Sequence, residues 1–241
     1  MKGFILCAGL GTRLRPLTDT VPKPLIDIDG ENVLEKIIIK LKNNGITEIA
    51  VNLHHLSDKI IGFLKSKNFG VKFHFSYEKE ILDTGGGIKK IKDFVSNENL
   101  IVHNGDVLTD FDLNSAINFH EKYRNDVTLC VMEREGSRKL AFDGEMNLSG
   151  WVNIEKNIHD GEVKDKIMYS FMGVHIISPS VFGFMPKEDK FPIFDFYIKN
   201  LKNIKIKGYP IKPDYWFDIG TYEKLEKAKN FFREFNKGRK L

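Results

Sequence analysis

The chain has 241 residues, 41% of them apolar and 29% charged, which is long and apolar enough to bury a core, so we exclude disorder as its main state. No apolar run approaches the roughly 18 residues that span a bilayer, and the apolar N-terminal segment continues into Gly11-Thr12-Arg13 without a cleavage pattern. We therefore expect neither a membrane protein nor a secreted one. The net charge of +4 comes mainly from 224–241, which holds seven of the 37 basic residues but two of the 33 acidic ones. Because the rest is nearly neutral, we expect no nucleic-acid binding.

Cys7 and Cys130, the two cysteines, both lie in apolar, strand-like runs. A thiol in such a run usually serves as a small buried apolar side chain. We therefore expect free thiols and a reducing, cytoplasmic location. The seven histidines show no metal-ligand spacing, and no serine or cysteine has the flanks of a nucleophile. Zinc chemistry and covalent acyl chemistry thus have no support.

The first half of the chain alternates strand and helix signals. Runs rich in β-branched residues predict strands at Gly3–Ala8, Glu48–Leu53, Val71–Tyr77, Leu100–Asn104 and Val127–Glu133. Helix-period segments lie between most of them. The first of these places five apolar side chains on one face, namely Val33, Leu34, Ile37, Ile38 and Leu41. This alternation predicts an α/β fold, with a Rossmann-like, mixed but mainly parallel central sheet and flanking helices.

After Glu133 the pattern changes. Residues 137–156 are polar and rich in turn formers, and a long strand-like run follows at Lys166–Ile177. We expect a smaller, antiparallel, β-rich lobe at about 134–177, within a single domain of residues 1–241. The last predicted element is a helix over 221–237. Six side chains share one broad face of that helix, namely Tyr222, Leu225, Ala228, Phe231, Phe232 and Phe235.

The most informative segment runs from Leu6 to Leu25, directly after the first predicted strand. Gly9 and Gly11 let the backbone approach a ligand closely, and N–H groups at the carboxyl end of a strand form a natural anion site. Arg13 and Lys23 add two positive charges. The third glycine of a dinucleotide fingerprint is absent, and so is the Gly-Lys-Ser/Thr of a P-loop. The segment therefore favours a phosphate-bearing ligand held in another way.

Two carboxylates follow predicted strands that lie far apart in the chain. Asp106 ends the apolar run 99–107, and Asp218 comes directly after another apolar run. A carboxylate there is costly unless it is paired or metal-bound, and Mg²⁺ is usually held by one or two carboxylates plus substrate phosphates. The two together suit a magnesium site. Asp110 and Asp112 are interpreted as structural, Asp112 as a helix cap.

Taken together, these segments resemble the nucleotidyltransferases that join a sugar 1-phosphate to a nucleoside triphosphate and release pyrophosphate. The resemblance is carried by Gly-x-Gly-Thr-Arg and Pro-Lys-Pro within Leu6–Leu25, by Thr84-Gly85-Gly86-Gly87, by Asn104-Gly105-Asp106 and by 216–221. It covers almost the whole chain and implies a GT-A-like fold with a sugar-binding lobe. Three stretches, the Thr-Gly-Gly-Gly segment, the Asn-Gly-Asp-Val of 104–107 and residues 137–143, are most similar to N-acetylmuramate 1-phosphate uridylyltransferases. Heptose and mannose 1-phosphate guanylyltransferases are also similar.

The resemblance implies a role for each matching residue. Nucleotide binding is expected of Leu6, Ala8, Gly9, Gly11, Thr12, Arg13, Lys23, Gly85 and Gly86, the last two through amides at the start of a helix. Arg13 and Lys23 are also the expected catalytic residues, since they would face the phosphates where negative charge builds. Sugar binding is expected of Asn104, Asp143, Glu155 and Gly173, although Asn157 stands where many relatives have proline after the Glu-Lys pair. Asp106 and Asp218 are the expected ligands of Mg²⁺.

The expected reaction joins an NTP, with UTP favoured and GTP second, to a sugar 1-phosphate, giving an NDP-sugar and pyrophosphate. A phosphocholine cytidylyltransferase is an alternative, disfavoured by the Thr-Gly-Gly-Gly segment and the lobe. A catalytically silent, nucleotide-binding subunit is another, disfavoured because both cations and both carboxylates are present. The sequence leaves open the base, the sugar and the oligomeric state.

Overall fold

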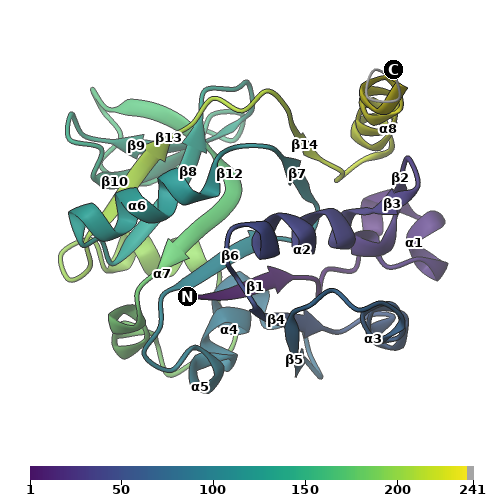
Figure 1. The fold of residues 1–241 in the computed structure, drawn as a ribbon. Coiled ribbons are helices and arrows are strands. Elements are labelled where there is room, and N and C mark those ends of the chain that lie inside the picture. The colour runs from purple at the N-terminus through teal and green to yellow at the C-terminus, as the bar shows by residue number, and fades with distance from the viewer. Residues whose placement is uncertain (238–241) are drawn as a thin grey trace.

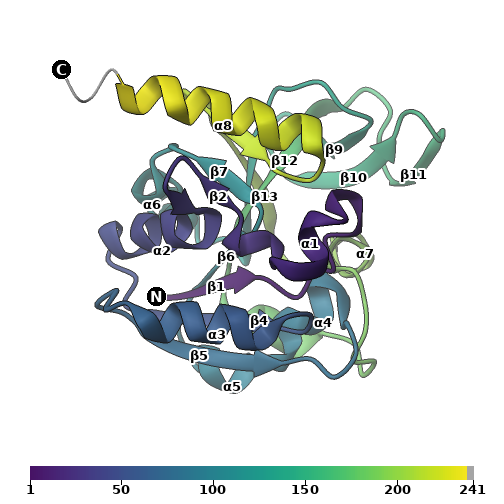
Figure 2. The same cartoon turned by 90° about the vertical axis from the view of Figure 1, so that its right-hand side faces the viewer.

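The structure, a computed structural model, describes residues 1–237 (Figure 1). Residues 238–241, the end of the predicted domain and of its basic segment, lie outside the described residues. The predicted α/β architecture is confirmed, with helices on both faces of a central sheet (Figures 1 and 2). None of the described helices is long and apolar enough to cross a membrane.

Four parallel strands form one half of the central sheet, in the spatial order β5, β4, β1, β6. Their bounds are β1 (Lys2–Leu6), β4 (Glu48–Leu53), β5 (Lys72–Tyr77) and β6 (Leu100–Asn104), all close to the predicted runs. In the register of β1 and β6, Leu6 lies opposite Asn104. The loops after these two strands therefore leave the sheet side by side, at the edge where open α/β sheets bind ligands.

The other half of the sheet contains the lobe. β12 (Ile167–Ile177) runs antiparallel to β6 and to β8 (Val127–Met132), and β13 (Ile206–Pro210) runs parallel to β8. The start of β12 pairs with β9 (Arg138–Phe142), which continues antiparallel into β10 (Leu148–Asn153) and β11 (Ile158–Gly161). The predicted antiparallel lobe is thus confirmed. Two small pairs lie apart from this sheet, β7 (Val107–Thr109) with β14 (Trp216–Asp218) and β2 (Asp27–Ile28) with β3 (Glu31–Asn32).

The helices form two apolar layers. On one face the core includes side chains of α2 (Val33–Asn43), α3 (Ser57–Ser66), α6 (Leu113–Tyr123) and α8 (Tyr222–Lys237). On the other it includes those of α4 (Asp83–Lys90), α5 (Lys92–Val95) and α7 (Ile193–Lys199). The short helix α1 (Leu17–Thr20) and the 3₁₀ turns Thr12–Leu14, Lys23–Leu25 and Pro179–Phe184 complete the described elements.

Local sequence signals explain where several helices begin. The Asn32 side chain accepts a hydrogen bond from the Glu35 N–H at 2.9 Å and caps α2, whose five predicted apolar side chains are all buried. Asp112 caps α6 by accepting from the Asn114 N–H at 3.0 Å, as predicted. On α8 the predicted face is buried in its centre at Leu225, Ala228 and Phe232. The exposed Tyr222 at its start donates to the Leu14 carbonyl at 3.0 Å and so ties α8 to the glycine-rich segment.

The two cysteines are free and buried, as predicted. Burial raises the pKa of the Cys130 thiol to about 12. Burial, and secondarily the charge of Asp106, also raises the pKa of the Cys7 thiol far above its ordinary range. Cys7 is therefore neutral at physiological pH and supplies no thiolate, although it lies beside the cavity described next.

Candidate active site

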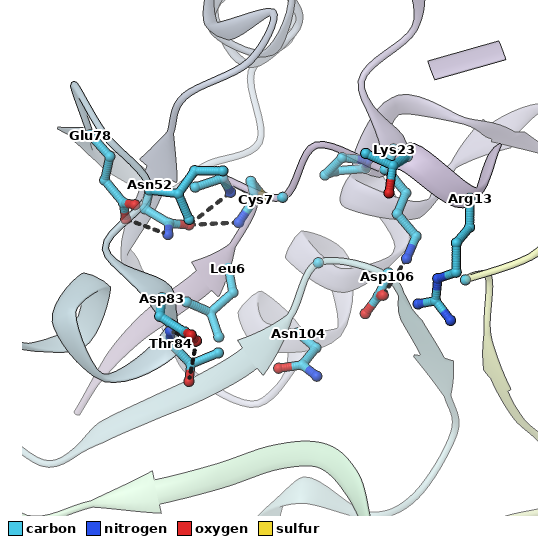
Figure 3. A pocket seen from close by; sticks show the side chains of 18 residues that line it. Leu6, Cys7, Arg13, Lys23, Asn52, Glu78, Asp83, Thr84, Asn104 and Asp106 are labelled. Carbon is cyan, nitrogen blue, oxygen red and sulfur yellow. Dashed lines mark hydrogen bonds and ion pairs between the residues drawn. The ribbon is translucent and has the colours of Figure 1, made fainter. Parts of the chain in front are cut away.

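A cavity of about 450 Å³ lies at the carboxyl ends of the parallel strands (Figure 3). It brings together the residues predicted within the glycine-rich segment, namely Leu6, Ala8, Gly9, Gly11, Thr12, Arg13 and Lys23. Asn104 and Asp106, from the neighbouring strand end, line it as well. Gly105 lets the two strand ends approach, since a Cβ there would lie 2.5 Å from the Leu6 carbonyl oxygen.

The glycine loop presents unpaired backbone donors. The N–H groups of Gly9, Leu10 and Gly11 have no acceptor among the described residues. Gly11 adopts a φ of 65°, and a Cβ there would lie 2.8 Å from Cγ2 of Thr18, so this turn requires glycine. A Cβ on Gly9 would meet nothing within 4 Å. The loop therefore has both the free amides and the open space that an anionic ligand needs.

Two cations line the cavity beside this loop. Figure 3 shows the Lys23 ammonium directed at the Asp106 carboxylate, with Arg13 close by. Lys23 and Asp106 form an ion pair, and their side chains are 13% and 30% exposed. Arg13 is exposed, and its guanidinium has no hydrogen-bond or ion-pair partner among the described residues. Arg13 is thus available to an incoming anion without loss of an internal contact.

The second predicted carboxylate lies close to the first. β14 pairs with β7 so that Asp218 is opposite Val107, and the Ile219 N–H donates to the Asp106 carbonyl at 3.0 Å. The backbones of the two carboxylate residues, far apart in the sequence, therefore lie side by side. Lys224 Nζ lies 2.5 Å from Asp218 Oδ2. Burial of the Asp218 carboxyl group opposes its ionisation, but hydrogen bonds from Lys224 and the Gly220 N–H, together with nearby positive charge, lower its pKa.

The donor set at this edge fits a hard divalent cation. Asp106 and Asp218 offer carboxylate oxygens, which Mg²⁺ prefers. In this structure Asp106 is paired with Lys23 and Asp218 with Lys224. Across residues 1–237 no group of three or more His, Cys, Asp and Glu side chains is placed to hold a metal. A cation here would therefore take its remaining ligands from substrate phosphates and water, as Mg²⁺ commonly does.

Two buried polar residues behind the glycine loop were not predicted. Asn52 Oδ1 accepts from the N–H groups of Cys7 at 2.6 Å and Ala8 at 3.3 Å, while its Nδ2 donates to Glu78 at 2.7 Å. The other Glu78 oxygen accepts from the Leu82 N–H at 2.9 Å. This network holds the start of the loop against β4. A polar Asn52 within the apolar strand Glu48–Leu53 was the one sequence signal that pointed to it.

The structure corrects the expectation that Gly85 and Gly86 present amides to the nucleotide. Both N–H groups donate to the Phe191 carbonyl, at 3.0 and 3.3 Å. A Cβ on Gly85 would lie 2.3 Å from the Phe191 ring, and one on Gly86 would lie 2.0 Å from the Asp189 carbonyl oxygen. These glycines allow α4 to pack against the segment before α7. Their neighbour Thr84 lines the cavity instead.

The four predicted sugar-binding residues divide into two groups. Asn104 lines the cavity, and Gly173 lies against the Asn104 side chain, because a Cβ on Gly173 would be 3.2 Å from Asn104 Nδ2. Asp143 and Glu155 do not line it. The Asp143 carboxylate closes its own hairpin by accepting from the N–H groups of Glu145 at 2.9 Å and Asn147 at 2.8 Å. Glu155 is exposed on the turn between β10 and β11.

Comparisons with known proteins agree with this geometry. A family model described as nucleotidyl transferase matches residues 2–234. The chain is 30% identical over 227 residues to the D-glycero-α-D-manno-heptose 1-phosphate guanylyltransferase of Campylobacter jejuni, covering 92% of this chain and 96% of that one. It is 29% identical over 232 residues to the N-acetylmuramate α-1-phosphate uridylyltransferase of Neisseria meningitidis, covering 95% and 96%. The crystal structure of HddC from Yersinia pseudotuberculosis complexed with GMP-PN has a TM-score of 0.77 at 27% identity, covering 96% and 99%.

Proposed function

Because the chain belongs to the nucleotidyl transferase family, we propose that it condenses a nucleoside triphosphate with a sugar 1-phosphate to give an NDP-sugar and pyrophosphate. The observation that carries this proposal is that free glycine-loop amides, Arg13, Lys23 and Asp106 line one cavity, with Asp218 on the strand that pairs directly after Asp106. That set can bind phosphates and neutralise their charge.

The nucleotide phosphates would lie on the loop. The N–H groups of Gly9, Leu10 and Gly11 would donate to phosphate oxygens, and Arg13 would contact the charge that builds as pyrophosphate leaves. Asn52 and Glu78 fix the loop in this arrangement before the ligand arrives. Preformed donors of this kind stabilise developing charge without reorganising during the reaction.

The attacking group needs no base from the protein. A sugar 1-phosphate has a second pKa of about 6, so its oxygen is already ionised at neutral pH. Phosphoryl and nucleotidyl transfer depend mainly on positioning and on charge neutralisation. Asp106 and Asp218 would hold Mg²⁺, which when bound neutralises phosphate charge. Lys23, already paired with Asp106, keeps a positive charge beside that carboxylate.

We propose UTP as the preferred nucleotide and GTP as the second. One relative is a uridylyltransferase and another a guanylyltransferase, and this chain resembles both to nearly the same degree. The polar side chains behind the loop, Asn52 and Glu78, are occupied by each other and by backbone N–H groups. The neighbouring Thr84 hydroxyl is occupied as well, by the Ile193 N–H and the Asp83 carboxylate, so base recognition would fall mainly to backbone groups.

A pyrophosphate-release panel tests the proposed function. The four common NTPs are crossed with sugar 1-phosphates, including the glucose, mannose, heptose and N-acetylmuramate forms, and with phosphocholine, all with Mg²⁺. We expect release only when an NTP and a sugar 1-phosphate are both present. Steady turnover of NTP alone would indicate a hydrolase, and activity confined to phosphocholine with CTP would indicate a cytidylyltransferase. Either result contradicts the proposal.

A further inference from the structure

Arg134 lies where the central sheet passes into the lobe, two residues after β8 ends at Met132. Two lobe side chains bond to its carbonyl oxygen. One is the Lys139 ammonium, and the other is the Ser170 hydroxyl at 3.3 Å. Lys139 also donates to Ser170 at 3.1 Å. The backbone of Arg134 is therefore fixed by β9 and β12, which places its side chain reproducibly.

The side chain of Arg134 reaches from the lobe to β14. Its guanidinium carbon lies 4.4 Å from the centre of the Trp216 ring, within range of a cation–π contact. Trp216 is anchored by its indole N–H, which donates to the Met172 carbonyl at 2.8 Å. Met172 precedes Gly173, which lies against Asn104 of the cavity. Arg134 does not itself line the cavity, but these contacts connect it to Asn104, which does.

The Arg134 guanidinium forms few of the hydrogen bonds that its N–H groups could donate. Its Nε is shut off from solvent and has no acceptor among the described residues, and Nη1 donates only to the Glu135 carbonyl at 3.3 Å. No described carboxylate forms an ion pair with Arg134. A half-buried guanidinium without an anionic partner is costly, because its desolvation is not repaid. The missing partner is therefore expected to be a ligand.

Asp218 lies near both Arg134 and Arg13. Trp216 and Asp218 are two residues apart on β14, so their side chains point to the same face. Burial lowers the pKa of Arg134, and the negative charge of Asp218 partly opposes this shift. The Asp218 carboxylate is therefore near enough to act on the guanidinium electrostatically, although the two form no ion pair. On the other side, a Cβ on Gly220 would lie 2.8 Å from Asp218 Oδ1 and 3.1 Å from Arg13 Nη2. Two arginines without an ion-pair partner among the described residues, one from the glycine loop and one from the lobe junction, therefore lie near Asp218.

The reaction joins two phosphates, and Arg13 belongs to the loop assigned to the NTP. We propose that Arg134 binds the phosphate of the sugar 1-phosphate, on the lobe side of Asp218. This inference rests on the proposed function. Arginine binds phosphate in bidentate fashion, so Arg134 would both hold the acceptor and orient its attacking oxygen toward the nucleotide.

Steady-state kinetics of three variants test this assignment. Arg134→Met removes the charge but keeps an apolar stem over Trp216, Arg134→Lys restores a point charge, and Arg138→Met removes an exposed arginine four residues away. We expect Arg134→Met to raise KM for the sugar 1-phosphate about 10- to 100-fold, the scale of one charged hydrogen bond. KM for the NTP should stay unchanged, Arg134→Lys should recover part of the loss, and Arg138→Met should behave like the wild type. A melting temperature within a few degrees of the wild type shows that Arg134→Met is folded.

The comparison of acceptors separates phosphate recognition from recognition of the sugar. Acceptors with and without a sugar carboxylate should lose the same factor in KM, because all carry the phosphate. A loss confined to carboxylated sugars would overturn the phosphate assignment, and so would an equal rise in KM for the NTP or an unchanged KM for the acceptor. If the wild type releases no pyrophosphate with any sugar 1-phosphate, the proposed function fails. If the wild type is active and Arg134→Met matches it, only this inference fails.

Discussion

Charged side chains around the cavity differ in whether the protein itself gives them a partner. Asp106 is paired with Lys23 and Asp218 with Lys224, whereas Arg13 has no partner among the described residues. An unpaired, exposed cation contributes little to folding. A substitution of Arg13 should therefore change catalysis with little effect on the stability of the fold.

We expect Arg13→Ala to lower kcat by about 10²-fold or more while leaving the melting temperature unchanged, because one contact to developing charge is lost. Lys23→Ala should cause a similar loss. Arg15→Ala is the control, since Arg15 lies two residues away and pairs only with the exposed Asp19. Pyrophosphate release and thermal melting measure both quantities. If Arg13→Ala unfolds the protein but keeps its activity per folded molecule, Arg13 has a structural role.

Asp106→Asn and Asp218→Asn should each raise the Mg²⁺ concentration needed for half-maximal activity, by about tenfold or more. An amide keeps the shape of the carboxylate but loses the charge that a hard cation prefers. Asp214→Asn, on the exposed loop before β14, should titrate like the wild type. Activity is measured against Mg²⁺ concentration for all three. If one of the two carboxylate variants shifts and the other does not, they do not share an ion.

At the scale of elements, the two glycine-rich segments do different things. Gly9 and Gly11 leave backbone amides free at the cavity, whereas Gly85 and Gly86 give their amides to the Phe191 carbonyl. The strands and α2 were predictable because their apolar residues repeat with a regular period. The role of a glycine depends on what approaches it, and for Gly86 that is a segment more than a hundred residues later. No local pattern encodes such an approach.

Contacts with distant segments also decide which residues of the lobe could be predicted. Its antiparallel strands were predicted from composition, but Asp143 and Glu155 were assigned to the sugar by motif alone. In the structure the Asp143 carboxylate is occupied by its own turn and Glu155 lies on an exposed one. Arg134, in contrast, was not predicted to belong to the site. Its placement depends on a contact with Trp216, on a strand far away in the sequence, and no pattern near Arg134 indicates that contact.

A pair of glycine substitutions tests the packing role of the Thr-Gly-Gly-Gly segment. Gly86→Ala places a Cβ 2.0 Å from the Asp189 carbonyl oxygen, so we expect overpacking to lower the free energy of unfolding by about 1–3 kcal/mol or more. Gly62→Ala, on the exposed face of α3, meets nothing within 4 Å and should raise it by about 0.5–1 kcal/mol through helix propensity. Urea unfolding measures both. Equal stabilities for the two variants would contradict the packing role.

Three buried histidines lead us to expect that the free energy of unfolding of the whole molecule depends markedly on pH. Burial lowers the pKa of His103 to about 4, of His120 to about 4 and of His175 to about 3, from an ordinary value of 6.5. Above pH 6.5 these groups are neutral in both states. As pH falls below 6.5 the unfolded chain takes up protons that the folded chain does not, so stability is lost progressively down to about pH 4.

Each such histidine contributes a slope of up to about 1.4 kcal/mol per pH unit in this window. Urea unfolding at pH 7.5, 6 and 5 measures the total slope. His175→Leu should reduce it, because both ring nitrogens of His175 are buried without a partner, whereas His159→Gln on the exposed β11 should not. Constant stability between pH 7.5 and 5 would show that the folded protein admits these protons.

In the proposed reaction the nucleotide's α-phosphorus is transferred to the phosphate of a sugar 1-phosphate. The most direct test supplies an NTP radiolabelled at either the α- or the γ-phosphorus, with and without a sugar 1-phosphate, and separates the products. We expect the α-label to enter an NDP-sugar and the γ-label to enter pyrophosphate, both only when the sugar 1-phosphate is present. Arg13→Ala should slow both equally. Release of the γ-label as orthophosphate, independent of the sugar 1-phosphate, would contradict the proposed reaction.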